Sequence, residues 1–130
     1  MAEFAAVEAR LRGILEPYRD RLETGTIYNR EILRRPGGRG HDWFAGVVPN
    51  KNYVSFYMLP IYSWPKLLDG MSPALRKRKQ GASCFNFSAV DEDQMAELAA
   101  LTERSFQAYM SGGASLAEGS PAAAASESRR

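Results

Sequence analysis

Apolar side chains at the start of the chain recur every three or four residues. They are Phe4, Val7, Leu11, Ile14, Tyr18 and Leu22. This spacing places them on one face of a helix, with charged residues largely on the other faces, so it predicts an amphipathic first helix. Pro17 lies within this pattern. Because a proline removes a helical hydrogen bond and its ring clashes with the preceding turn, we expect a kink or an early end near Glu16.

Runs of β-forming and apolar residues in the middle of the chain predict strands. We expect four strands, at residues 26–33, 43–48, 53–59 and 83–87. A turn-forming cluster at residues 49–52 separates the second strand from the third, so these two strands are predicted to form a hairpin. Residues 53–59 are apolar at both alternating sets of positions. This indicates that both faces of the strand are covered, or that one face forms the wall of a pocket.

The remaining elements are helical. Residues 64–69 predict a short helical turn, and Ser72 before a proline predicts the start of a short helix that runs to Lys79. Asp91 caps a final helix, with Gln94 at the capping-box position. The predicted order is α-β-β-β-α-β-α. Because short turns join adjacent strands, we expect a two-layer α+β fold, with an antiparallel sheet of about four or five strands and helices on one face.

A length of 130 residues and a hydrophobic content of 45% are sufficient for one domain whose core needs neither disulfides nor metals. From residue 111 onward the chain consists mainly of glycine, alanine, serine and a few charges. We therefore expect a folded domain over residues 1–110 and a disordered tail over residues 111–130. No apolar run approaches the roughly 20 residues that span a bilayer. The single cysteine, Cys84, and the absence of a signal-like amino terminus predict a cytoplasmic protein.

The formal net charge of +2 argues against a nucleic-acid partner, because phosphate binding usually requires a strongly basic domain. One dense basic run is present, and it consists of Arg76, Lys77, Arg78 and Lys79. Its residues point in several directions from one helical turn, which favours a solvated helix end that complements the helix dipole. A site for phosphate or for an acidic partner is the alternative interpretation.

Residue types that carry catalysis are sparse. His41 is the only histidine, so neither a paired-histidine metal site nor a Ser-His-Asp arrangement has a basis, and a surface role is favoured for it. Cys84 lacks a CxxC companion, which favours a buried small residue over a reactive thiol. The glycines at 37, 38 and 40 match no nucleotide-binding pattern. The sequence therefore predicts no catalytic residue, no metal site and no cofactor, and it favours a protein that is not an enzyme.

Aromatic residues are concentrated in the predicted hairpin and just after it. Strands place alternate residues on opposite faces, so one set of aromatic side chains belongs to the core, and the other lines a cavity or a partner surface. The candidate ligand-binding residues are Trp43, Tyr53, Tyr57, Tyr62 and Asn86. Core packing or a dimer contact is the alternative for this set, and a homodimer is compatible with the sequence.

Three blocks of the sequence carry a family resemblance: KNYVSFYMLP at residues 51–60, LDGMSPALRKR at residues 68–78 and QGASCFNF at residues 80–87. They resemble the bacterial YdhG-like family, also known as the domain of unknown function DUF1801, and the similarity extends over about residues 4–110. The resemblance implies a compact α+β fold of the group that also holds the YjbR-like and frataxin-like proteins. It brings no catalytic residues, and Tyr57 stands where many members have a histidine. Some members are described as iron chaperones, which implies an exposed acidic ridge of oxygen ligands.

The leading interpretation is a non-enzymatic module that binds a small molecule or a protein through the aromatic residues of the hairpin. This interpretation fails if Trp43, Tyr53, Tyr57 and Tyr62 all lie in one closed core. Frataxin-like iron binding is the first alternative, and nucleic-acid binding through residues 76–79 is the second.

Overall fold

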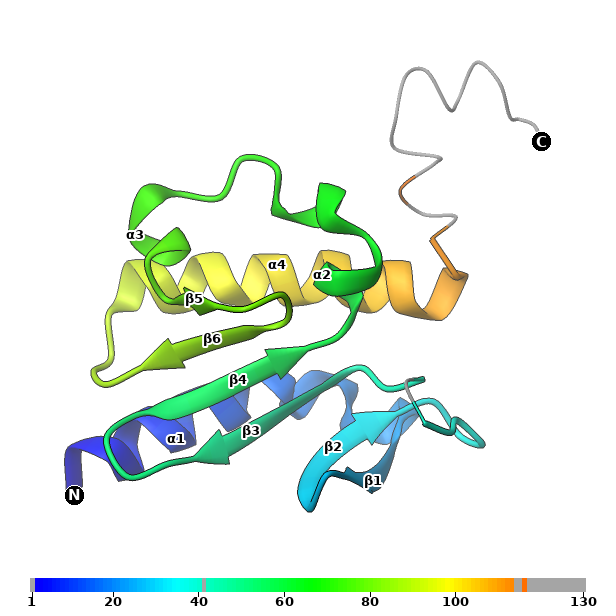
Figure 1. Ribbon diagram of the computed structural model, residues 1–130, viewed down its shortest axis with the longest axis horizontal. Helices are drawn as coiled ribbons and strands as arrows, with labels where there is room; N and C mark the ends of the chain where they lie inside the picture. The colour runs from blue at the N-terminus through cyan, green and yellow to red at the C-terminus, as the bar shows by residue number, and fades with distance from the viewer. Residues whose placement is uncertain (1, 41, 114–115, 117–130) are drawn as a thin grey trace.

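The computed structural model describes residues 2–40, 42–113 and 116. Its helices (α), 3₁₀ helices (η) and strands (β) are α1 (Ala2–Leu15), η1 (Glu16–Arg21), β1 (Glu23–Ile27), β2 (Arg30–Arg34), β3 (Ala45–Pro49), β4 (Val54–Met58), α2 (Pro60–Ser63), η2 (Pro65–Leu68), α3 (Pro73–Arg76), β5 (Lys79–Gln80), β6 (Cys84–Phe87) and α4 (Glu92–Ser111). The protein is thus of the α+β class. In chain order, the described strands follow an amino-terminal helix and precede a long carboxyl-terminal helix (Figure 1). Within the described ranges, no helix is both long and apolar enough to cross a membrane.

The first helix forms as its apolar spacing predicts. Val7, Leu11 and Leu15 are buried on one side of α1. The α-helix ends at Leu15, and the chain continues as the tighter helix η1, which has Pro17 in its first turn. This confirms the predicted early end, because proline is tolerated in the first turn of a new helix, where its missing N–H would have no partner. The 3₁₀ helix then carries Tyr18 into the core.

The prediction of a single strand over residues 26–33 is wrong. Strands β1 and β2 pair there as a tight antiparallel hairpin, with Ile27 opposite Arg30. The two residues between the strands have left-handed backbones, with φ of 51° at Tyr28 and 64° at Asn29. Asparagine is common in such turns, but tyrosine is a strand-forming residue, so Asn29 was the only sign of the reversal among the side chains.

The basic run needs a second correction. The short helix α3 begins as predicted, because the Ser72 hydroxyl caps it by accepting a backbone hydrogen bond. It ends at Arg76, however, and not at Lys79. Lys77 and Arg78 form a turn, and Lys79 and Gln80 then form strand β5 because they pair with β6. The Asn86 N–H also donates to the carbonyl oxygen of Arg78. The sheet therefore has six strands, and the predicted element order is incomplete.

All neighbouring strands are antiparallel, in the spatial order β1-β2-β3-β4-β6-β5. The predicted central hairpin is confirmed as β3 and β4, which pair along their whole length. Strands β2 and β3, by contrast, share one paired position, Leu33 with Ala45. This short contact lets the β1-β2 hairpin leave the plane of the central strands.

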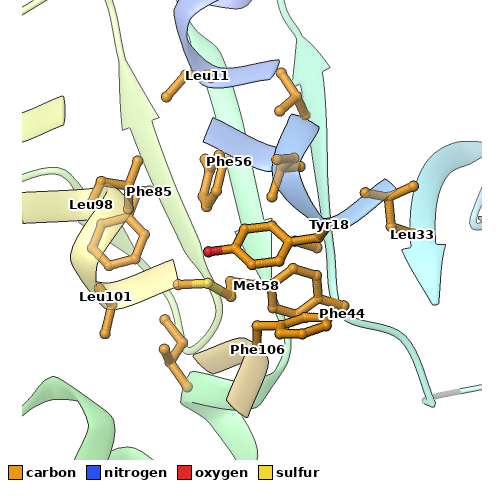
Figure 2. Packing of buried hydrophobic residues seen from close by; sticks show 14 of the residues in the cluster. Leu11, Tyr18, Leu33, Phe44, Phe56, Met58, Phe85, Leu98, Leu101 and Phe106 are labelled. Carbon is orange, nitrogen blue, oxygen red and sulfur yellow. The ribbon is translucent and has the colours of Figure 1, made fainter. Parts of the chain in front are cut away.

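Helices α1 and α4 cover one face of the sheet and lie behind it in Figure 1. Side chains from this face and from the helices form one continuous core. Figure 2 shows the Tyr18 ring inside it, close to Phe44, Phe56 and Met58. The Tyr18 hydroxyl donates to the Glu103 carboxylate of α4 at 2.7 Å. The opposite face, which we call the open face, is turned toward the viewer in Figure 1 and carries neither α1 nor α4.

Helix α4 begins where the sequence predicts. The Asp91 carboxylate accepts a hydrogen bond from the Gln94 N–H at 3.0 Å, as a capping residue should. The helix ends at Ser111. Most of the predicted disordered tail, residues 111–130, lies outside the described residues, so its disorder and the domain limit at residue 110 stay predictions.

Gly46→Ala should destabilise the protein. A Cβ at this position in β3 would lie 2.6 Å from the backbone oxygen of Glu31, so β2 would have to move. We expect a loss of about 1–3 kcal/mol in the free energy of unfolding, as for other overpacked sites, measured by urea denaturation. Gly13→Ala is the matched control in α1, because a Cβ there meets nothing within 4 Å. The control should stabilise the protein by about 0.5–1 kcal/mol through helix propensity, and an unchanged stability of Gly46→Ala would contradict the close approach of β2.

Tyr18→Phe should cost about 1 kcal/mol of stability at pH 7, because it removes the hydrogen bond to Glu103 and keeps the ring. The Tyr18 hydroxyl, followed by the Gln107 amide, lowers the pKa of the Glu103 carboxyl. A pKa lowered in the folded state gives stability that is present above the unfolded pKa and is lost as the pH falls through the folded pKa. The difference between the two proteins in urea denaturation should therefore shrink below about pH 4.3, the ordinary glutamate pKa. A difference that stays constant between pH 7 and pH 3 would contradict this assignment.

Candidate functional site

Alternate residues of β4 and β6 point onto the open face. Phe56 and Phe85 are fully buried in the core on the helix side, so their neighbours in the strands point the other way. These neighbours are Ser55, Tyr57, Cys84 and Asn86. The antiparallel register places Ser55 opposite Asn86 and Tyr57 opposite Cys84.

A directed chain of hydrogen bonds orients the polar side chains of this face. The Asn50 amide donates to the Ser55 hydroxyl at 2.9 Å, and that hydroxyl donates to Asn86 Oδ1 at 2.7 Å. The Cys84 thiol donates to the same oxygen at 3.3 Å. Because Oδ1 accepts both bonds, the Nδ2 donors of Asn86 point away from this chain, and they have no partner among the described residues.

Cys84 and Tyr57 keep their protons at neutral pH. Burial raises the pKa of the Cys84 thiol, although hydrogen bonds with Ser55 and Tyr57 and the charge of Arg30 oppose this change. Burial also raises the pKa of Tyr57, whose ring centre lies 5.4 Å from the Arg30 guanidinium carbon. The sequence predicts a buried small residue at Cys84, whereas the structure shows a partly buried thiol with polar partners.

The β1-β2 hairpin bends across the open face. The neighbours of Gly46 in β3 face the core, so Gly46 faces the open side, where the Glu31 carbonyl oxygen lies directly above it. The absence of a side chain permits this approach. Further along β2 toward the turn, Arg30 reaches the ring of Tyr57. Ile32 and Trp43 are buried but lie outside the main core, which places a second, smaller set of apolar contacts on this side.

A cavity of about 430 Å³ opens near the hairpin turn and the end of β4. We call it the aromatic pocket, and its lining residues are Tyr28, Trp43, Leu59, Tyr62, Ser63, Ala82 and Ser83. Tyr28 and Tyr62 are 76% and 63% exposed, whereas Trp43 is only 7% exposed. The buried indole N–H of Trp43 has no hydrogen-bond partner within the described part of the chain. The pocket therefore has accessible aromatic rings, and one of its lining residues carries a buried donor with no described partner.

A neighbouring cavity of about 400 Å³ shares Trp43, Leu59 and Ser63 with the aromatic pocket. Two charged residues of its lining, Arg35 and Asp42, already have partners. Arg35 donates to the Asp42 carboxylate at 3.0 Å and to the Tyr109 carbonyl oxygen at 2.9 Å, and its guanidinium lies over the Tyr109 ring. These contacts attach the loop before β3 to α4, so we assign this cavity a structural role.

A third cavity, of about 440 Å³, is lined almost entirely by polar side chains. We call it the cationic cavity, and its lining residues are Asn52, Tyr53, Lys77, Arg78, Gln80, Asn86 and Ser88. Lys77 and Arg78 form no ion pair with a described residue, and Arg78 Nε is buried without a hydrogen-bond partner among them. Positive charge and hydrogen-bond donors therefore converge here with no carboxylate among the described lining residues.

The predicted ligand-binding residues divide between two sites. Trp43 and Tyr62 line the aromatic pocket, whereas Tyr53 and Asn86 line the cationic cavity. Tyr57 lies on the open face and lines neither of them. These aromatic residues do not share one closed core, so the condition that would remove the binding hypothesis is not met.

Sequence reasoning missed Tyr28 and treated the basic run as one unit. Tyr28 enters the pocket only because the chain reverses at this residue, and Asn29 was the one signal of that turn. Within the basic run, Lys77 and Arg78 line the cationic cavity, whereas the other two residues do not. Strand β5 redirects the chain after α3, and this change of direction separates the four side chains.

The iron-binding alternative receives no support from the geometry. Within the described ranges, no group of three or more His, Cys, Asp or Glu side chains could hold a metal ion. Carboxylates near the amino terminus lie in ion pairs, with Glu8 to Arg12 at 2.8 Å and Glu16 to Arg19 at 3.7 Å. His41 lies outside the described residues, so its surface role stays a prediction.

Comparison with protein-family models, with curated proteins and with solved structures finds no match to this chain. The fold and the candidate sites therefore rest on the residues and contacts described above.

Cys84 should react slowly with iodoacetamide in the folded protein. Burial keeps the thiol protonated and restricts access, so at pH 8 we expect alkylation at least about tenfold slower than in urea. The raised pKa also means that the associated stability is fully present below the unfolded pKa and is lost as the pH rises through the folded pKa. Mass spectrometry measures the rate without ambiguity, because Cys84 is the only cysteine. A folded protein that reacts faster than the unfolded chain would show an activated thiol and contradict this assignment.

Proposed function

We propose that this protein is a non-enzymatic binding module that holds a small planar molecule in the aromatic pocket. The observation that carries the proposal is a cavity flanked by two exposed tyrosines and lined by Trp43, whose buried indole N–H has no partner among the described residues. A ligand that accepts a hydrogen bond from this group would remove the cost of leaving it unpaired, about 1–3 kcal/mol for a buried donor.

The size and lining of the pocket support a small aromatic ligand. Its volume of about 430 Å³ falls within the roughly 300–1,000 Å³ of small-molecule sites. Tyr28 and Tyr62 come from the hairpin turn and from α2, and they present rings that a planar group could stack on.

The lining of the pocket also favours binding over catalysis. Its described residues are apolar, aromatic or hydroxyl-bearing, and they include no histidine, cysteine, lysine or carboxylate. General acid–base catalysis needs a group whose pKa lies near the working pH, within hydrogen-bond reach of the ligand. The ligand should therefore be uncharged where it meets this pocket.

We further propose, on the resemblance alone, that the chain is a cytoplasmic member of the YdhG-like family. In the structure, the resembling blocks 51–60 and 80–87 contain β4 and β6, the two strands that carry the centre of the open face. The block at residues 68–78 contains α3 with its Ser72 cap and the basic residues of the cationic cavity. A conserved open face would thus be the shared feature of such a family.

A neutral planar heterocycle such as adenosine should bind in the aromatic pocket at millimolar concentration. We expect a concentration-dependent shift of the Trp43 indole N–H resonance in ¹H–¹⁵N NMR spectra. Tyr28→Ala and Tyr62→Ala should each weaken binding by about three- to tenfold, since a ring contact contributes roughly 0.5–1.5 kcal/mol. Tyr53→Ala is the matched control, because it removes a part-exposed tyrosine that lines only the other site.

Two results would contradict the proposed function. One is that none of a set of neutral planar heterocycles moves the Trp43 resonance. The other is that Tyr62→Ala changes the sedimentation of the protein from a dimer to a monomer without affecting binding of any probe. In that case the exposed tyrosines would form a contact between two copies of the chain.

A further inference from the structure

The cationic cavity differs from the aromatic pocket in the charge of its lining residues. Its two cations sit side by side in sequence, in the turn between α3 and β5, and the start of β4 and the end of β6 complete its walls. Elsewhere in the described chain, five arginines have carboxylate partners: Arg10, Arg12, Arg19, Arg34 and Arg35. Lys77 and Arg78 have none, so their charge remains available.

Among the lining residues, Arg78 gives the main reason to expect a bound anion. Its side chain is partly buried, and Nε is enclosed without a hydrogen-bond partner among the described residues. A buried guanidinium N–H that leaves water without gaining an acceptor is destabilising. An oxyanion in the cavity would supply that acceptor, and the fork of guanidinium donors matches the oxygens of phosphate or carboxylate.

Asn86 adds a neutral donor that is already oriented. The hydrogen-bond chain from Asn50 through Ser55 ends on its Oδ1, as does the Cys84 thiol. The amide is therefore held with its oxygen toward the strand centre, and its Nδ2 hydrogens are left for the cavity that Asn86 lines. Tyr53 and Ser88 contribute hydroxyl groups to the same walls. A site with two cations, fixed donors and no carboxylate among its described lining residues selects an anion.

We propose that the cationic cavity is an oxyanion site that holds the phosphate group of a small molecule through Lys77, Arg78 and the Asn86 amide. Phosphate suits the site better than a carboxylate, because it carries nearly two negative charges at pH 7 and offers three oxygens to these donors. The oxyanion site bears on the proposed function in one respect, which is that a single ligand could occupy both sites. Ser83 of the aromatic pocket and Asn86 are three residues apart along one chain segment, roughly 10 Å at strand spacing, so one elongated ligand could reach both.

Inorganic phosphate is the probe for this site. Titrated into the full chain at low ionic strength and followed by NMR, it should shift the Asn86 side-chain amide and the Arg78 Nε–H resonances with saturation in the millimolar range. Arg78→Gln and Lys77→Gln should each weaken phosphate binding by about tenfold, the loss expected for one charge-assisted hydrogen bond. Arg76→Gln removes the same charge from the same run but does not line the cavity, so it should weaken binding by no more than about twofold.

Several results would overturn the proposal. The first is that phosphate causes no saturable shifts. The second is that Arg76→Gln and Arg78→Gln lose phosphate binding equally. The third is that a single-stranded oligonucleotide binds through all four basic residues while phosphate does not bind. Lys77 is exposed, so Lys77→Gln keeps the test valid if Arg78→Gln fails to fold. Phosphate binding does not depend on the aromatic pocket. Failure with phosphate alone removes the anion site, and failure with adenosine alone removes the proposed function.

Discussion

The ring of Phe44 packs against three other aromatic rings, and the layered structure depends on these contacts. Its centroid lies 5.6 Å from that of Tyr18, 5.4 Å from that of Phe106 and 5.8 Å from that of Tyr109. The four residues come from η1, from the position just before β3 and from α4. Aromatic side chains bury large areas and favour edge-on or offset contacts, so this cluster fixes η1 and α4 on the same side of the sheet. The open face exists because both long helices are held there.

A face without helices must still provide partners for its polar groups. Ser55 is only 1% exposed, and its hydroxyl is satisfied by Asn50 and Asn86. The hairpin supplies apolar cover where Gly46 allows β2 to approach. The centre of the open face is therefore packed and hydrogen-bonded. The aromatic pocket and the cationic cavity occupy different stretches along β6 and its preceding turn, and each keeps one buried donor without a described partner.

The basic residues of this nearly neutral protein differ in whether they form ion pairs. Most exposed ion pairs contribute little to stability, so the paired arginines do not hold the fold together. Lys77 and Arg78 remain without described partners and lie beside neutral donors, whereas the described lining of the aromatic pocket carries no charge. Two cavities with different lining, one uncharged and one cationic among the described residues, thus occur in a nearly neutral protein.

The sequence by itself determined the features whose cause is local. The spacing of Val7 and Leu11 defined the first helix, Pro17 ended it, and the caps at Ser72 and Asp91 started later helices. Each depends on a few neighbouring residues and on backbone hydrogen bonds within one turn. The apolar content of residues 53–59 also indicated that β4 has one core face and one occupied outer face.

Only the tertiary structure decided where the candidate binding residues meet. Tyr28 adopts a left-handed conformation that its residue type does not favour, because pairing of β1 with β2 requires a reversal there. Lys77 and Arg78 face a cavity because β5 pairs with β6, and Asn86 faces it because the strand register puts Phe85 in the core. Strand register, and the choice of which face the helices cover, are set by contacts between residues far apart in the chain. Alternation along one strand shows that its two faces differ, but it does not show which strand lies beside it or which face the helices cover.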